Sequence, residues 1–494
     1  MSGFPYLTVL IFLPLVGSVL ALLSRQGQAA RTIALVTSLL TLGLGLLVAG
    51  QFQSSQAGFQ LQERFQPWAA EGLGASYHLG IDGISLLLIL LTTVLSAVSV
   101  IASWHIERQP ALYFGLLLIL ETGMLGTFAS LDLVLFYIFF ETTLVPMYFL
   151  IGLWGYENRV YAAYKFFLYT MSGSVLMMLA ILGLYFVGGH TFDLPALLQA
   201  GVPAGAQYWL FLGFAIAFAI KVPLFPLHTW LPDAHTEAPT AGSVLLDGIL
   251  LKLGNFGFVR FCLPLFPDAS RAFAPLVMTL AVIGILYGAM VAVAQKDLKR
   301  LVAYSSVAHL GFVMLGLFAG TSQGISGAVL QMVNHGLSTG ALFLLVGMLA
   351  DRRHTRQLAA FGGLWRQMPV FGALFIITAL ASAGLPGLNG FVGEFLILQG
   401  SFLANETLAA LGTAGVILAA VYLLHAVGQV LHGKLTAQNA QLSDAKSWEL
   451  FALVPLVLLM LWIGLRPNTF LRPLDQAVAQ VVSRLELVTA QETR

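Results

Sequence analysis

The chain has 494 residues, of which 58% are hydrophobic and only 9% are charged, whereas a typical soluble domain has about 25% charged residues. This composition excludes a soluble globular protein and indicates a polytopic membrane protein. The net charge of +1 gives no indication of a nucleic-acid partner. A single cysteine, Cys262, excludes an internal disulfide and a cysteine-ligated cluster on this chain alone.

Apolar stretches of about 20 residues, the length that spans a bilayer, recur along the whole sequence. The first has no basic segment before it and predicts a retained spanning helix rather than a cleaved signal. The gaps are too short for a soluble domain, and the largest, 51–80, has room for a small hairpin. We predict fourteen spans, at 5–23, 31–50, 81–103, 111–129, 131–151, 164–187, 209–225, 241–264, 272–294, 300–320, 325–349, 369–391, 394–431 and 450–466.

The basic residues predict the orientation of these spans. An even number of spans places both termini on the same side of the membrane. Of the 23 Lys and Arg residues, fourteen fall in loops on the opposite side, seven on the side of the termini, and two, Lys221 and Lys252, within spans. Because basic loops are retained in the cytoplasm, we expect both termini on the non-cytoplasmic side.

Ionisable side chains inside the predicted spans are the strongest functional signal. Each opposes membrane insertion by about 2.5–3.5 kcal/mol unless it is compensated, so they must face one another, water or other polar groups. Buried lysines can alternate between charged and neutral forms, and histidines titrate near neutrality. Such a set favours a proton path over a single catalytic centre. Its members are Glu121, Glu141, Lys221, Asp247, Lys252, His309, His335 and Glu394.

Several of these residues also have a purely structural interpretation. Glu121 could simply hydrogen-bond a neighbouring helix, and His309 and His335, which small residues flank, could serve packing. Asp247 and Lys252 are five residues apart, about 140° around an ideal helix, so we do not pair them.

"HTWLPDAH", with His228 and His235 seven residues apart, indicates a metal site only weakly. We therefore expect no metal and no bound cofactor on this chain.

Two spans are interrupted close to a charged residue. Pro223 follows Lys221, and Pro386 with the nearby glycines precedes Glu394. Irregular backbone at membrane depth occurs only inside protein or beside a wet cavity, and transporters place it at ion sites. The interrupted spans are the seventh and the twelfth. Their spacing predicts two inverted five-helix repeats and four regions: 1–110, 111–264 (first repeat), 272–431 (second repeat) and 450–494.

Long stretches of the chain resemble one known family. They are "FETTLVPMYFLIGLWG", "AFAIKVPLFPLHTWLPDAHTEAPTAGSVLLDGILLKLG", "KDLKRLVAYSSVAHLGFVMLG", "MVNHGLSTGALFLLVG" and "LPGLNGFVGEFLILQGSF". These resemble the M-type antiporter-like membrane subunit of complex I, the NuoM/NdhD family or chain 4 of NAD(P)H–quinone oxidoreductases. The resemblance covers roughly residues 80–470. The related Mrp-type Na+/H+ antiporter subunits share the two broken helices and remain an alternative, as does a non-pumping structural subunit.

The resemblance implies a proton path that runs, in order, through Glu141, Lys221, Lys252, His309, His335 and Glu394. Glu141 and Lys221 would form a coupled pair, and Glu394 would connect to the outside. Glu121, His228 and Asp247 are accessory candidates. The implied partners are lipid and the other membrane subunits of a complex-I-like assembly, including neighbouring antiporter-like subunits. Quinone (plastoquinone in a thylakoid) and the redox cofactors would be held by partner subunits, which oxidise NAD(P)H or ferredoxin.

Two positions depart from the family pattern. Asp247 stands where a small residue is expected, and the thirteenth span lacks an expected arginine, for which His425 could substitute. These departures raise the hypothesis of a cyanobacterial paralogue, including the type devoted to carbon dioxide uptake. The corresponding location is a bacterial inner membrane or a cyanobacterial thylakoid membrane.

Overall fold

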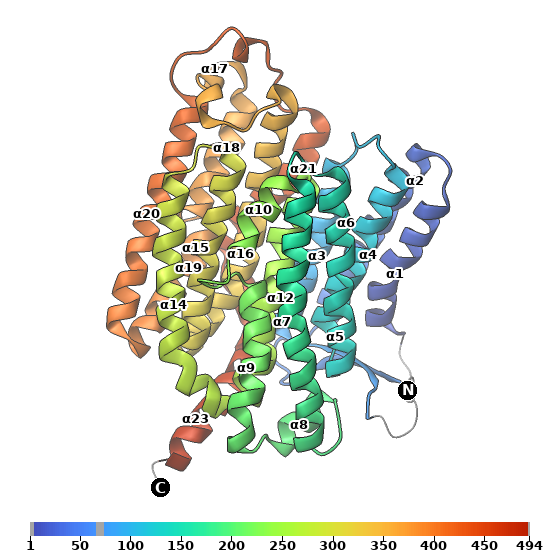
Figure 1. Cartoon of the computed structure of the whole chain (residues 1–494), viewed down its shortest axis with the longest axis vertical. Helices are drawn as coiled ribbons and strands as arrows, with labels where there is room; N and C mark the ends of the chain where they lie inside the picture. Colours follow the sequence, from blue (N-terminus) through green and yellow to red (C-terminus); the bar gives the residue numbers. More distant parts are fainter. Residues whose placement is uncertain (1–3, 66–73, 493–494) are drawn as a thin grey trace.

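The computed structural model describes residues 4–65 and 74–492, and long helices that run along a common axis dominate it (Figure 1). Thirteen helical segments of this part are long and apolar enough to cross a membrane. A further span consists of two shorter helices, α18 (Pro369–Ser382) and α19 (Asn389–Ala404). The prediction of an all-helical membrane protein with about fourteen spans is confirmed.

The spans have the following bounds. The first six are α1 (Tyr6–Leu23), α2 (Gly27–Gln51), α3 (Gly83–Ala102), α4 (Pro110–Ala129), α5 with α6 (Leu133–Thr142 and Leu144–Trp154) and α7 (Arg159–Val187). The eighth joins α11 (Thr240–Leu245), η1 (Leu246–Leu250), α12 (Leu251–Gly257), η2 (Phe258–Cys262) and α13 (Leu263–Leu265). The others are α9 (Ala204–Lys221), α14 (Pro267–Val293), α15 (Leu298–Phe318), α16 (Ser322–Arg353), α20 (Glu406–Leu431) and α21 (Ser447–Leu465).

Short elements connect the spans. They are α8 (Leu194–Ala200), α10 (Trp230–Glu237), η3 (Leu358–Ala360), α17 (Leu364–Gln367), η4 (Asn439–Gln441), α22 (Asn468–Leu471) and η5 (Arg472–Leu474). The chain closes with α23 (Asp475–Glu492). Several helices begin where a polar side chain accepts hydrogen bonds from the first free N–H groups. These capping residues are Asp82, Asp132, Asp297, Thr321 and Asn405.

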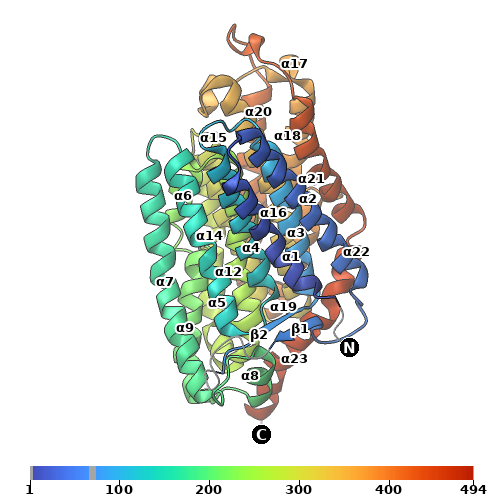
Figure 2. The same ribbon diagram turned by 90° about the vertical axis from the view of Figure 1, so that its right-hand side faces the viewer.

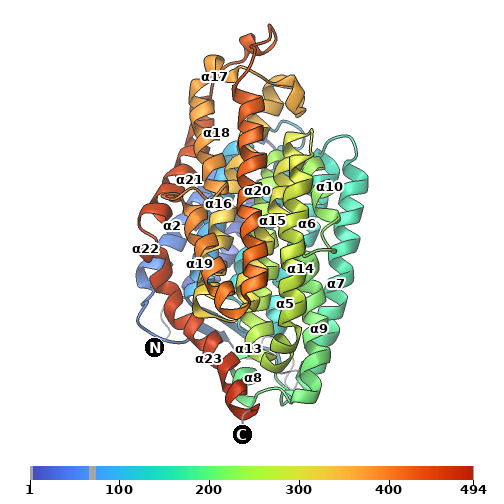
Figure 3. The ribbon, with the colours of Figure 1, turned by 90° about the vertical axis from the view of Figure 1, so that its left-hand side faces the viewer.

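The start of α1 and the end of α23 lie at the same end of the bundle, and α17 lies at the other (Figures 1 and 3). The hairpin expected within 51–80 is present there (Figure 2), as β1 (Gln60–Phe65) and β2 (Tyr77–Ile81) in antiparallel pairing. Glu63 of β1 accepts hydrogen bonds from the backbone N–H groups of Leu7 and Thr8. The hairpin therefore holds the first turn of α1.

Both interrupted spans are broken as expected. Helix α9 ends at Lys221, and α10 begins only at Trp230. The second break separates α18 from α19, so Glu394 lies in the second half of the twelfth span and the thirteenth begins at Glu406. The predicted limits 394–431 were wrong, because α19 ends at Ala404 and the side chain of Asn405, in the polar run Asn405–Thr407, caps the start of a separate helix, α20.

Burial divides the spans into central and peripheral ones. The apolar stretches of the eighth span and of α16 are 100% buried and that of α15 is 94% buried, whereas α2 and α20 are each 33% buried. The peripheral helices present apolar side chains outward, as lipid contact requires. The central three spans carry three of the six predicted proton-path residues, Lys252, His309 and His335.

At the end that carries the termini, one buried ion pair joins α3 to the eighth span. The guanidinium of Arg260 donates to both carboxylate oxygens of Asp82, at 2.6 and 2.7 Å, and to Ser85 Oγ at 3.0 Å. Burial alone would raise the pKa of Asp82, but the charge and hydrogen bonds of Arg260 outweigh it and hold this pKa below 3.8. The pair therefore stabilises the folded chain above about pH 4 and loses its effect as the pH falls through the depressed pKa.

We expect Arg260→Met to destabilise the protein, because it leaves the Asp82 carboxylate buried without its partner, a loss of about 3–5 kcal/mol. Thermal unfolding of the purified assembly at neutral pH measures this. Arg25→Met, at an exposed residue, is the control. The double variant Asp82→Asn/Arg260→Met should recover part of the loss, since neither charge is then buried alone. An unchanged Tm for Arg260→Met would contradict the role given to this pair.

Candidate proton-transfer site

Lys252 is fully buried at one end of a row of polar side chains. Its Nζ lies 2.7 Å from His335 Nδ1, and it donates a hydrogen bond to the backbone carbonyl of Asp247. The ring centroids of His335 and His309 are 5.6 Å apart. All three predicted side chains are at most 3% exposed. The eighth span, α16 and α15 thus bring three predicted residues together.

The row continues from His309 to the second broken span. His309 Nδ1 is 3.0 Å from Glu394 Oε1, and its Nε2 is 3.1 Å from the hydroxyl of Tyr422 on α20. Gln331 Nε2 donates to the same Glu394 oxygen at 3.2 Å. The spatial order is Lys252, His335, His309, Glu394. The predicted order, with His309 before His335, was wrong because α16 lies between α15 and the eighth span at this level.

Paired amides hold the start of α19 against α16. Asn334 donates to the carbonyl of Asn389 at 2.8 Å, and Asn389 donates back to the carbonyl of Asn334 at 3.1 Å. Asn334 also donates to Gln331 Oε1 at 3.2 Å. The interrupted backbone is thereby compensated by side chains, and Glu394 is fixed one turn further along the helix.

A π-helical turn in the eighth span explains the position of Asp247. The turn, η1, covers Leu246–Leu250 and replaces the α-helical hydrogen bonds by i→i+5 bonds. It lets Lys252 reach the carbonyl of Asp247, although the two side chains do not form an ion pair with each other. The carboxylate instead lies 3.4 Å from His235 Nε2 and 3.8 Å from His335 Nδ1.

Glu141 and Lys221 lie apart from this row. Lys221 is the last residue of α9 and is 2% exposed, and its ammonium lies 4.9 Å from the ring centroid of Phe140 and 5.9 Å from that of Phe166. Glu141, on α5, is half-buried. Within the described ranges no ion pair of 4 Å or less joins the two. Aromatic faces therefore compensate the Lys221 charge in this state.

The remaining candidates stand outside the row. Both carboxylate oxygens of Glu121 are buried without a hydrogen-bond partner in the described part of the chain. His228 stacks on Phe225 and lies edge-on to Tyr287. His425 lies exposed on α20, and its substitution for the arginine expected in that span stays a prediction.

Sequence reasoning missed three members of the site. Tyr422 and Gln331 gave no signal, because neither type is unusual in a spanning helix. His235 appeared only in the motif "HTWLPDAH", and its proximity to Asp247 depends on how α10 packs against the eighth span.

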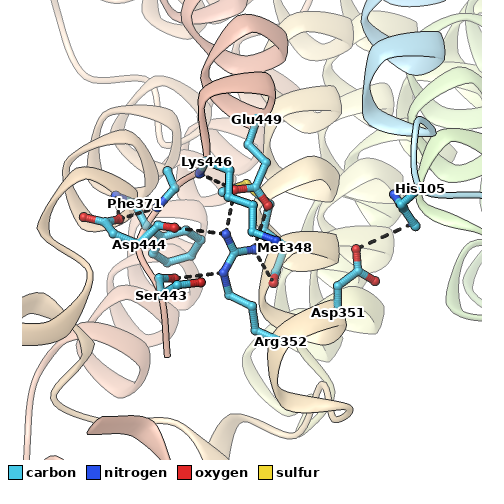
Figure 4. Close-up of polar contacts among 10 residues, drawn as sticks. His105, Met348, Asp351, Arg352, Phe371, Ser443, Asp444, Lys446 and Glu449 are labelled. Carbon is cyan, nitrogen blue, oxygen red and sulfur yellow. Dashed lines mark hydrogen bonds and ion pairs between the residues drawn. The ribbon is translucent and has the colours of Figure 1, made fainter. Parts of the chain in front are cut away.

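At the end that carries α17, charged side chains surround a cavity of about 750 Å³. Figure 4 shows part of its wall, where Arg352 donates to both carboxylate oxygens of Glu449 at 2.6 Å and Asp351 faces His105 at 3.9 Å. The lining includes Glu237, two residues after His235. The cavity therefore reaches helix α10, which also carries His235.

Comparison with known proteins agrees with this architecture of two broken spans around buried lysines, histidines and carboxylates. The family described as "NADH:quinone oxidoreductase/Mrp antiporter, TM" matches residues 130–421. NADH-quinone oxidoreductase subunit M of Rhodobacter capsulatus is 44% identical over 96% of both chains, and that of Escherichia coli K12 is 44% identical, also over 96% of both. A chain of respiratory complex I from Thermus thermophilus superposes with a TM-score of 0.90 at 36% identity, covering 97% of this chain and 99% of that one.

The chain is thus an antiporter-like membrane protein in architecture. It belongs to the family of M-type antiporter-like subunits of complex I. A chain of the Mrp complex from Dietzia shares the fold, with a TM-score of 0.85 at 19% identity over 97% of this chain and 98% of that one. The hypothesis of a cyanobacterial or carbon-dioxide-uptake paralogue finds no support in the relatives named above, which are subunits M of NADH-quinone oxidoreductases.

We expect Gly393→Ala to disturb the site without breaking the helix. A Cβ at this position would lie 2.3 Å from Gln331 Oε1 and 2.9 Å from Asn334 Nδ2, so the amides that hold Glu394 must move. Proton pumping, normalised to assembled protein, should fall several-fold. Gly428→Ala on α20 is the matched control, since its added Cβ meets nothing within 4 Å. Equal pumping by the two variants would argue against a role for this amide network.

Proposed function

We propose that the chain is a proton-translocating subunit of a complex-I-type NADH–quinone oxidoreductase in a bacterial inner membrane. The observation that carries this proposal is the row Lys252–His335–His309–Glu394, in which hydrogen-bond contacts join the first two and the last two residues and the two rings lie side by side. Its neighbouring contacts of 2.7 and 3.0 Å and its ring separation of 5.6 Å lie within reach of direct or water-mediated proton transfer. Electron transfer and its cofactors would belong to other subunits of the assembly. Its membrane part would also contain further antiporter-like subunits.

Each group in the row can give and take a proton in turn. An ammonium at Lys252 can donate to His335 Nδ1, and the neutral amine that results can be reprotonated. A histidine receives a proton at one ring nitrogen and releases another from the second nitrogen. His309 presents Nδ1 to Glu394 and Nε2 to the Tyr422 hydroxyl, so a proton from His335 would enter at Nε2, through that hydroxyl or a bridging water. Glu394 lies beside the break between α18 and α19, where irregular backbone favours water access, so it is our candidate for exchange with the outside.

Lys221 has the features of a switch. It lies at the end of α9, where Val222 and Pro223 interrupt the helix, and aromatic rings rather than a carboxylate face its ammonium. Movement of the half-buried Glu141 towards it would stabilise the ammonium by charge, and withdrawal would favour proton release. Redox steps in the partner subunits would drive this movement.

We expect Lys221→Ala to lose most coupled proton transfer, and Lys221→Arg to fail as well, because a guanidinium does not release its proton in a protein. A loss of about tenfold or more would correspond to at least about 1.4 kcal/mol. Proton uptake into vesicles is measured per electron transferred and normalised to assembled complex. Lys434→Arg, at an exposed residue, is the matched control. Full pumping by Lys221→Arg would leave Lys221 as a fixed charge and remove the switch.

The orientation is part of the same proposal and has its own test. Basic residues concentrate in the loops at the α17 end, which favours that end as the cytoplasmic one. Cys262 is buried, so single introduced cysteines report cleanly. Lys434→Cys should react with an impermeant thiol reagent only from the cytoplasmic side and Phe4→Cys, at a residue 57% exposed, only from the other. The opposite labelling pattern would invert the direction of the proposed path.

A further inference from the structure

Asp247 lies between two histidines that come from different helices. Its Oδ1 is 3.4 Å from His235 Nε2 on α10, and its Oδ2 is 3.8 Å from His335 Nδ1 on α16. The side chain is wholly buried, and neither oxygen has a hydrogen-bond partner among the residues described. These contacts are longer than strong hydrogen bonds. The carboxylate therefore acts on its neighbours mainly through its charge.

In the part of the chain that the structure describes, the helices packed against η1 present no second acid to Asp247. The elements packed against η1 are α3, α11, α12 and α16, and the sequences of α3 and α11 contain no charged residue. Helix α12 contributes Lys252, α16 contributes His335, and α10 adds His235. At the end of α10, Lys299 of α15 donates to the carbonyl of Ala238, and Glu237 accepts a hydrogen bond from the Asn158 N–H. The other charged residues of α16 lie at its far end. Glu394 lies further from Asp247, at the opposite end of the row, where it contacts His309. Three proton-binding side chains thus share one nearby carboxylate.

The row from Lys252 to Glu394 is complete without Asp247. Asp247 is therefore an addition to the path rather than one of its necessary members.

We propose that Asp247 is a positioning residue whose fixed negative charge keeps a proton on the group formed by Lys252, His335 and His235, and so extends proton pumping to higher pH. The inference rests on the proposed function. A charge about 4–6 Å away in a protein interior has an effect of about one to two pH units after partial screening. The charge, rather than the volume or the hydrogen-bonding capacity of the side chain, is what matters.

The experiment measures protons pumped per electron as a function of pH, from about pH 6 to pH 9, in vesicles that contain the assembled complex. Asp247→Asn keeps the shape and removes the charge, Asp247→Ala removes both, and Asp247→Glu keeps the charge. Asp475→Asn, at an exposed acid, is the matched control.

For Asp247→Asn and Asp247→Ala we expect the alkaline limb of the profile to move down by about one to two pH units, with pumping near pH 6 close to that of the wild type. Asp247→Glu should keep the limb within about half a unit of the wild type. If one variant fails to assemble, the other still reports, since both remove the charge.

Three results would overturn the inference. One is a wild-type profile for both uncharged variants. Another is loss of pumping at every pH, which would make Asp247 an obligatory carrier. The third is a shift for Asp247→Ala alone, which would indicate packing. The proposed function fails separately, if the wild-type assembly does not pump or if Lys252→Met pumps normally.

Discussion

A charge in the hydrocarbon core of a membrane is tolerated only where the protein compensates it, and the central part of this fold follows from that constraint. The three most buried spans carry Asp247, Lys252, His309 and His335, half of the ionisable residues predicted inside spans, and their side-chain partners come from other helices. Lys252 contacts His335 of α16, whose ring lies beside that of His309 of α15 at a tilt of 56°, and His309 contacts the carboxylate of Glu394 on α19. The peripheral helices are apolar outside because nothing there would compensate a charge.

A break in a membrane-spanning helix must also be compensated by the protein. Each break frees backbone groups that lipid cannot satisfy, and the structure supplies partners for them. At the first break, Trp230 donates its indole N–H to the carbonyl of Ile220 at 2.9 Å. At the second, Asn334 and Asn389 exchange hydrogen bonds. These hydrogen bonds therefore stabilise both breaks. Lys221 lies beside the first break and Glu394 beside the second.

Much of this arrangement could be predicted from the sequence, because membrane spans have a strong signal. The number of spans, the two breaks, the hairpin before the third span and the set of central residues all follow from hydropathy, proline positions and charges within apolar runs. Tertiary packing determined the rest. The order of His335 and His309 depends on which helix lies between two others. The contact between Asp247 and His235 depends on a π-helical turn that no local pattern in "SVLLDGILLK" indicates.

At the same π-helical turn, the backbone carbonyl and the side chain of Asp247 have different partners. The backbone carbonyl of Asp247 accepts a hydrogen bond from Lys252, whereas the carboxylate faces the two histidines. Any residue at position 247 would supply that carbonyl, so the hold on Lys252 does not depend on the side chain. Only an acid supplies the charge. In the proposed proton path, the backbone therefore fixes the position of Lys252, whereas the side chain at position 247 determines the charge near the proton that Lys252 and His335 would share.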